Sequence, residues 1–207
     1  MVDKNKTKFR TVFIISVVFF SILAINFYLK SSLWVLDSIS DVALIVAIYF
    51  LRNVLKLDFK EFVWLLTPIY ISILGSLGAY SWAHNNFQFD NFLHFYSAFI
   101  VTWIIFSHFS KTVSKKVKLS LPVLFLIVIG IISFFGLIVE ITEFIGFQYL
   151  GNGDGVFFTG VGDGEGVMLY IDTMQDLVIN LCGGILAYVM FYFFKYKKVY
   201  LKSNTKT

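Results

Sequence analysis

The stretch LPVLFLIVIGIISFFGLIVEITEFIGF, which runs from Leu121 to Phe147, decides the fold of this chain. A helix that crosses a bilayer needs about 20 consecutive, mostly apolar residues, and this run is longer than that. Its only charged side chains are Glu140 and Glu143, near its end. Nothing in it follows the two-residue period of a half-buried strand. The stretch therefore predicts a membrane-spanning helix.

Other apolar stretches meet the same criterion: roughly Thr11–Leu29, Leu33–Leu51, Phe62–Trp82, Phe92–Phe109 and Tyr170–Phe194. Hydrophobic residues make up 58% of the chain and charged residues 14%, whereas soluble domains carry about 25% charged residues. We therefore predict an all-α polytopic membrane protein of about six transmembrane helices. It would form a single integral membrane domain over residues 1–207, with a glycine-rich outer loop at 149–169.

The basic residues predict the orientation of these helices, because cytoplasmic loops carry an excess of lysine and arginine. With the N-terminus inside, every lysine and arginine except Lys30 falls in a cytoplasmic segment. Both termini are then cytoplasmic, and we expect a multi-pass protein of the cell membrane. The basic residues behind the net charge of +4 thus lie along one membrane surface. We therefore expect the lipid bilayer, not nucleic acid, as the partner.

Most of the acidic residues fall on the opposite, outer side, and several of them share a helix face. Helical spacing puts side chains at i, i+3 and i+4 on the same face. The groups with this spacing are Asp90 with His94; Glu140 with Glu143; and Asp172 with Asp176 and Asn180. Ionisable groups are costly in lipid and normally face the helix bundle or a wet cavity. We therefore expect one polar layer near the outer membrane face.

Like charges gathered in such a layer repel, and three remedies are open: shared protons, a bound metal cation or a cationic ligand. Carboxylates with one imidazole suit Mg²⁺, Ca²⁺ or Mn²⁺, with Zn²⁺ possible through His94. The expected metal ligands are His94, Glu140, Glu143, Asp172 and Asp176. Of these, Glu140, Glu143 and Asp176 are also the candidate catalytic acid–base groups. Supporting roles are expected for Asp90, Asn180, Asp41 and Asp163.

Plainer interpretations compete for several of these residues. Asp90 and Asp172 could be helix N-caps, and Asn180 could form an interhelical hydrogen bond. Gly183 and Gly184 suit close helix packing. The role of Asp37 and Asp41 is ambiguous, because the start of their helix could slide by several residues. The loop Gly151–Gly166, which contains Asp163, is either a flexible acidic lid or a plain connector.

The order of the polar motifs resembles that of the VanZ-like membrane proteins. These carry Asp-x3-His at a helix start, a glutamate at a helix end and Asp-x3-Asn-x2-Gly in a later helix. The matching stretches are DNFLH at 90–94, Glu140 within VEITE, and DLVINLCG at 176–183. The likeness is closer to a branch typified by the YjdF inner-membrane proteins, where a glycine-rich segment precedes Asp-Thr-x2-Asp, as in GDGEGVMLYIDTMQD at 162–176.

This resemblance covers roughly residues 85–190 and implies a small helical membrane protein. One member of the VanZ-like family is linked to glycopeptide resistance at the cell surface, but the family supplies no established reaction. VanZ-like proteins often carry an arginine between the glutamate and the last motif, and this chain lacks it. The anion-binding role of that arginine therefore cannot be carried over.

Three functions remain open on the sequence. The favoured one is a divalent-cation site at the outer face that holds or activates a phosphate-bearing lipid or lipid-linked envelope precursor, with phosphoryl transfer or hydrolysis as the reaction class. A proton- or cation-coupled transporter is the second, although no polar chain reaches the inner side. A non-catalytic membrane scaffold or partner protein is the third. Whether the protein is an enzyme stays open.

Overall fold

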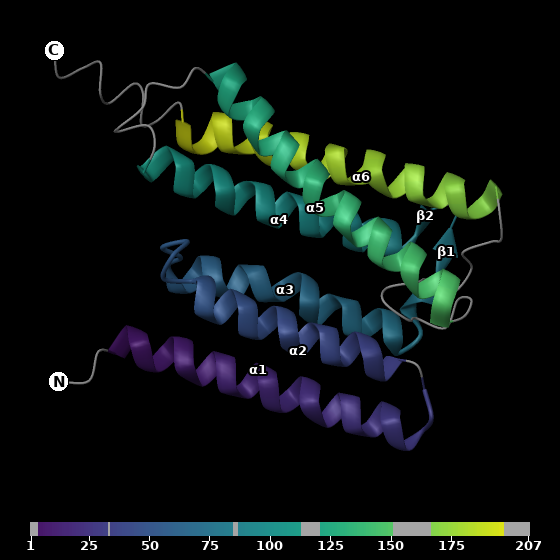
Figure 1. Cartoon of the computed structure of the whole chain (residues 1–207). Coiled ribbons are helices and arrows are strands. Elements are labelled where there is room, and N and C mark those ends of the chain that lie inside the picture. Colours follow the sequence, from purple (N-terminus) through teal and green to yellow (C-terminus); the bar gives the residue numbers. More distant parts are fainter. Residues whose placement is uncertain (1–3, 33, 85–86, 113–120, 151–166, 197–207) are drawn as a thin grey trace, which may run out of the picture. The chain divides into compact units, whose positions relative to one another are not determined.

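The structure, a computed structural model, describes residues 4–32, 34–84, 87–112, 121–150 and 167–196. Within these ranges the helices are α1 Lys4–Leu29, α2 Trp34–Leu51, α3 Phe59–Ser76, α4 Phe89–Thr112, α5 Leu121–Leu150 and α6 Val167–Phe191 (Figure 1). The shorter elements are the 3-10 helix η1 Ala79–Ser81, the antiparallel strands β1 Ala83–His84 and β2 Phe87–Gln88, and the π-helical turn η3 Tyr192–Tyr196. The predicted all-α fold is confirmed.

Five of these helices, α1, α2, α4, α5 and α6, are long and apolar enough to cross a membrane. α3 is not among them; its 18 residues include Lys60 and Glu61 near the N-terminal end. Large apolar side chains remain exposed on the candidate spans, for example Ile22 at 60% and Leu126 at 67%. Lipid tails are as apolar as such side chains, so these faces suit a bilayer.

The chain divides into two compact units, which are described one at a time. Unit 1 comprises residues Met1–Leu93 and Ile138–Thr173, and unit 2 comprises His94–Leu137 and Met174–Thr207. The helices α4, α5 and α6 each contribute to both units. The prediction of a single domain over the whole chain stays a prediction.

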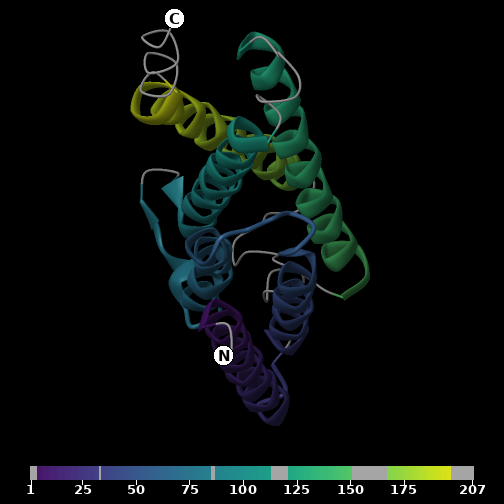
Figure 2. The same ribbon diagram turned by 90° about the vertical axis from the view of Figure 1, so that its left-hand side faces the viewer.

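In unit 1, α1 and α2 lie side by side along their lengths, and α3 packs against both (Figures 1 and 2). Their shared core is a cluster of buried apolar side chains: Phe20, Ile45, Phe62, Leu66, Ile69 and Ile73. The start of α3 is fixed locally by a capping box, in which Asp58 accepts from the Glu61 N–H and Glu61 accepts from the Asp58 N–H. Such reciprocal bonds satisfy helix donors that would otherwise lack partners.

The predicted helix Phe62–Trp82 is wrong at its C-terminal end, because α3 stops at Ser76. Gly78 has φ +119°, a left-handed conformation that favours glycine and commonly ends a helix. The chain then turns through η1, which brings the ring of Tyr80 over Gly75. A Cβ at Gly75 would overlap that ring. The two glycines therefore convert an apolar run into a shortened helix followed by a buried tyrosine.

In unit 2, segments of α4, α5 and α6 share a second core formed by the buried side chains of Ala98, Phe106, Val128, Ile132 and Phe191. α6 approaches α4 closely at Gly183, where a Cβ would overlap the carbonyl oxygen of Phe95. A Cβ at Gly184 would lie 3.3 Å from Oγ1 of Thr102, a tight contact but not an overlap. The packing interpretation of Gly183 and Gly184 is thereby confirmed.

Candidate functional site

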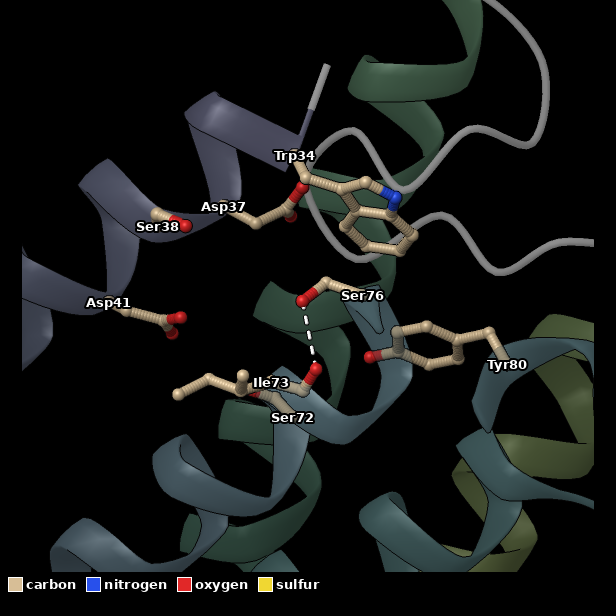
Figure 3. A pocket seen from close by; sticks show the side chains of 8 residues that line it. All are labelled: Trp34, Asp37, Ser38, Asp41, Ser72, Ile73, Ser76 and Tyr80. Carbon is tan, nitrogen blue, oxygen red and sulfur yellow. Dashed lines mark hydrogen bonds between the residues drawn. The ribbon is translucent and has the colours of Figure 1, made fainter. Parts of the chain in front are cut away.

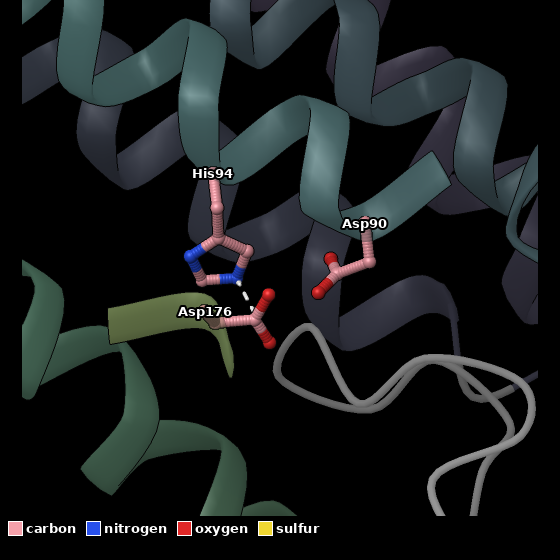
Figure 4. A group of neighbouring side chains, drawn as sticks. All are labelled: Asp90, His94 and Asp176. Carbon is pink, nitrogen blue, oxygen red and sulfur yellow. Dashed lines mark ion pairs between the residues drawn. The ribbon is translucent and has the colours of Figure 1, made fainter. Parts of the chain in front are cut away.

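Within unit 2, His94 of α4 lies beside the polar residues of α6 (Figure 4). The Nε2 atom of His94 lies 4.0 Å from Oδ2 of Asp176. On the other side of the ring, Nδ2 of Asn180 lies 3.2 Å from Nδ1 of His94. Asp176 is 0% exposed, His94 7% and Asn180 6%. The imidazole is therefore held between a buried carboxylate and a buried amide.

Helix geometry explains this arrangement. Asp176, Asn180 and Gly183 follow one another at spacings of four and three residues, so they share one face of α6. Gly183 lets the two backbones approach at Phe95, and the polar side chains one and two turns earlier meet His94. Asn180 also lies against Gly136 of α5, where no side chain competes for its space. The predicted interhelical hydrogen bond of Asn180 is confirmed.

Asp90 precedes His94 by one turn on the same face of α4, so the helix itself fixes the two side chains near each other. The prediction that Asp90 caps this helix is wrong, because α4 begins at Phe89 and places Asp90 inside its first turn. The capping bond comes instead from Asn91, whose Oδ1 accepts from the Gln88 N–H at 2.8 Å. The carboxylate of Asp90 is buried, at 7% exposed.

The other predicted ligands have different surroundings. α6 begins at Val167, so the prediction that Asp172 opens and caps this helix is wrong; its side chain is half-buried. Glu140 and Glu143 are 4% and 8% exposed on α5, as expected for groups that avoid lipid. Asp163 and the glycine-rich loop lie outside the described residues.

An acidic pocket lies within unit 1, between the start of α2 and the end of α3 (Figure 3). Asp37 and Asp41, 7% and 4% exposed, point into it from α2, and Ser72 and Ser76 line it from α3. The indole of Trp34 stacks on the ring of Tyr80, with ring centroids 5.5 Å apart and planes inclined by 5°.

The phenol of Tyr80 is held in its neutral form by this pocket. Burial raises the pKa of Tyr80 well above its usual value of 10.0, and the carboxylates of Asp90, Glu143, Asp37 and Asp41 raise the pKa further. All four carboxylates belong to unit 1. Each would repel a phenolate, so Tyr80 remains a hydrogen-bond donor at neutral pH.

Replacing Tyr80 by phenylalanine is expected to reduce the loss of stability at alkaline pH. Above the unfolded-state pKa of about 10 the unfolded chain releases the phenol proton while the folded protein keeps it, so stability falls as pH rises. Tyr80→Phe removes that contribution. Apparent unfolding temperatures measured in detergent between about pH 9 and pH 11 test this. The control is Tyr28→Phe, since Tyr28 is 72% exposed; an equal effect of both variants would contradict the assignment.

Several pocket residues were not predicted from the sequence: Trp34, Ser38, Ser72, Ile73, Ser76 and Tyr80. A signal was present, because Ser72, Ser76 and Tyr80 recur at four-residue spacing in an apolar run. That spacing places polar groups on one helix face. The turn at Gly78 brings Tyr80 back over the end of the helix. The four-residue spacing does not predict this turn.

The buried acidic and histidine side chains on α4 and α6 are of the kinds that could hold a metal ion. Carboxylate oxygens suit hard cations, and the imidazole of His94 extends the range to transition metals such as Zn²⁺. The apolar spans and this buried polar group together define a polytopic membrane protein embedded in the lipid bilayer.

Comparison with known proteins agrees with that class. The chain belongs to the family described as "Predicted membrane protein (DUF2238)", whose model matches residues 9–197. No curated protein and no solved structure matches the chain.

Proposed function

We propose that this membrane protein binds a divalent cation through His94 and Asp176 and uses it to hold a phosphate-bearing lipid or lipid-linked envelope precursor. The observation that carries the proposal is the pair of contacts around one buried imidazole. Asp176 lies 4.0 Å from Nε2, and Asn180 lies 3.2 Å from Nδ1.

The separation of His94 and Asp176 suits a shared cation better than a hydrogen bond. A hydrogen bond between nitrogen and oxygen requires about 2.7–3.2 Å, so the 4.0 Å separation is too long. Nitrogen and oxygen atoms that each lie about 2.0–2.2 Å from one Zn²⁺ are at most about 4.3 Å apart. With the longer bonds of about 2.3–2.6 Å around Ca²⁺, the limit rises to about 5 Å. One cation can therefore bind both side chains.

Asn180 has the properties of a residue that orients a metal-binding histidine. Such a histidine normally donates its second ring N–H to an oxygen, which fixes the ring and the tautomer. The amide of Asn180 has a donor end and an acceptor end, so it can meet Nδ1 of His94 in either protonation form. Binding of the cation at Nε2 would put the proton on Nδ1 and the oxygen of Asn180 toward it.

The sequence suggests three further residues as oxygen ligands of the cation: Glu140, Glu143 and Asp172. It also suggests acid–base roles for Glu140, Glu143 and Asp176. A bound cation would act there as a Lewis acid and template. Carboxylates repel phosphate directly, so an acidic site that handles a phosphate group needs a cation between them. Phosphoryl transfer or hydrolysis is therefore the reaction class to test first.

We place this site at the extracytoplasmic face of the cell membrane, with both termini cytoplasmic. The distribution of lysine and arginine supports that orientation. The resemblance to VanZ-like and YjdF-type proteins supports a role in the cell envelope. Of the motifs that carry the resemblance, the Asp176–Gly183 stretch contacts His94 and Phe95 in unit 2.

The first experiment measures binding of Zn²⁺ and Mn²⁺ to chelator-stripped protein in detergent micelles by calorimetry. His94→Ala is expected to weaken binding by at least about tenfold, since it removes the nitrogen ligand. His108→Ala is the matched control, because His108 lies on the same helix α4 and outside the proposed site. Equal binding by wild type, His94→Ala and His108→Ala would overturn the proposal.

A second experiment separates the possible activities. Purified protein in liposomes is supplied with phosphate-bearing lipids, and phosphate release is compared with and without the divalent cation. Cation-dependent release that His94→Ala abolishes supports lipid phosphate chemistry. Flux driven by a pH gradient, without phosphate release, would instead assign a coupled transporter. If there is neither phosphate release nor flux and a partner protein co-purifies, the result would indicate a non-catalytic scaffold.

A further inference from the structure

The pocket between α2 and α3 has acidic residues of its own, Asp37 and Asp41. It lies wholly within unit 1. Its cavity volume is about 10 Å³, which is room for one water molecule or one monatomic ion. Organic cations and larger ligands do not fit a space of that size.

One carboxylate oxygen in this pocket is buried without a hydrogen-bond partner. Asp41 is 4% exposed, its Oδ1 atom has no partner, and its side chain points into the cavity (Figure 3). One turn further along α2 the side chain is Ile45, part of the buried apolar cluster. Ile73 of the same cluster lines the pocket, so a charge on Asp41 must be offset by something inside the cavity.

The hydroxyl groups on the opposite wall cannot supply protons to Asp41. Ser72 donates its hydroxyl proton to the Ile69 carbonyl oxygen at 2.7 Å, and Ser76 donates to the Ile73 carbonyl oxygen at 2.9 Å. Only the lone pairs of these two hydroxyl oxygens remain for the cavity. Ser38 and Tyr80, which also line the cavity, carry one hydroxyl donor each. The carboxylates of Asp37 and Asp41 offer two acceptor oxygens each, so the walls still present an excess of hydrogen-bond acceptors.

A small cation satisfies such a cavity, because it takes electron pairs from every oxygen at once. We propose that the pocket binds one Ca²⁺ ion through the carboxylates of Asp37 and Asp41 and the hydroxyl oxygens of Ser72 and Ser76. The double charge matches two carboxylates, and an oxygen-only donor set suits a hard cation. Ca²⁺ accepts irregular geometry, whereas Mg²⁺ demands near-ideal octahedral coordination and dehydrates reluctantly, which the small cavity disfavours.

Tb³⁺ luminescence tests this site, because Tb³⁺ replaces Ca²⁺ and is sensitised by nearby aromatic rings. Trp34 and Tyr80 line the pocket, so a bound Tb³⁺ ion is expected to emit when they are excited. Ca²⁺ is expected to compete for the signal, and Asp41→Asn to weaken Tb³⁺ binding by at least about tenfold through loss of a charged ligand. Ser72→Ala and Ser76→Ala are expected to weaken it less.

Asp58→Asn is the matched control: it makes the same chemical change at the N-cap of α3, where asparagine caps as well as aspartate. Apparent unfolding temperature with and without Ca²⁺ gives a second readout, and Ca²⁺ is expected to raise it in wild type and Asp58→Asn but not in Asp41→Asn. If Asp41→Asn does not fold, Tb³⁺ binding by Ser72→Ala and Ser76→Ala tests the site instead.

The outcome is separable from that of the proposed function. His94→Ala and Asp176→Asn are expected to keep the Ca²⁺-sensitive Tb³⁺ signal, and Ser72→Ala and Ser76→Ala to keep Zn²⁺ binding. A signal that survives in both Asp37→Asn and Asp41→Asn would overturn the calcium site. So would a wild-type protein whose stability responds to pH but not to Ca²⁺, because the pocket would then hold a proton instead.

Discussion

Replacing Asp176 by asparagine is expected to weaken Zn²⁺ binding by more than about 100-fold, beyond the 10–100-fold loss typical of an outer-shell partner. Asp176 is 0% exposed and its Oδ2 atom lies 4.0 Å from Nε2 of His94. Asparagine keeps the shape of the side chain but removes the charge that attracts the cation. The measurement is competitive titration of Zn²⁺ against a chelator of known affinity, in detergent micelles.

Asn180→Ala should rank below Asp176→Asn in the same titration. Its amide contacts Nδ1 of His94 at 3.2 Å, so its loss frees the ring to rotate and is expected to cost about 10–100-fold in affinity. Asp58→Asn, the same change as Asp176→Asn at an exposed helix cap, should leave the affinity unchanged. A loss in Asn180→Ala that exceeds the loss in Asp176→Asn would exclude Asp176 as a ligand.

Replacing Gly183 by alanine is expected to destabilise the protein by about 1–3 kcal/mol, the usual range for overpacking a tight core. The new Cβ would overlap the carbonyl oxygen of Phe95 and lie 3.3 Å from Cβ of Ala98. A carbonyl within the helix cannot rotate away, so α4 and α6 must separate. That movement would also draw Asn180 and Asp176 away from His94, so Gly183→Ala should weaken Zn²⁺ binding as well.

Gly130→Ala is the matched control for this variant, because a Cβ at Gly130 of α5 meets nothing within 4 Å. Alanine favours a helix interior over glycine by about 1 kcal/mol, so Gly130→Ala should leave stability unchanged or raise it. Apparent unfolding temperature in one detergent reports both variants. An unchanged value for Gly183→Ala would mean that α4 and α6 do not pack tightly at this point.

The ends of the helices show which structural features the sequence pattern predicts and which it does not. The long apolar run Leu121–Phe147 predicted α5, which extends from Leu121 to Leu150, because twenty or more apolar residues in a row have few other stable structures. The end of α3 was not predicted, since the run continues apolar to Trp82 while the backbone turns at Gly78. Glycine permits that turn but does not force it. The packing of Tyr80 against Gly75 stabilises the turn.

What the sequence by itself determined is local: the apolar spans, and the polar side chains that share a face within each helix, such as Asp176 with Asn180. What only the tertiary structure decided is which faces meet. It brought Asp176 and Asn180 to His94, and it placed Asp37 and Asp41 opposite Ser72 and Ser76. The physical reason is that helical periodicity follows from backbone geometry within a few residues, whereas contacts between helices depend on side-chain packing between segments far apart in the chain.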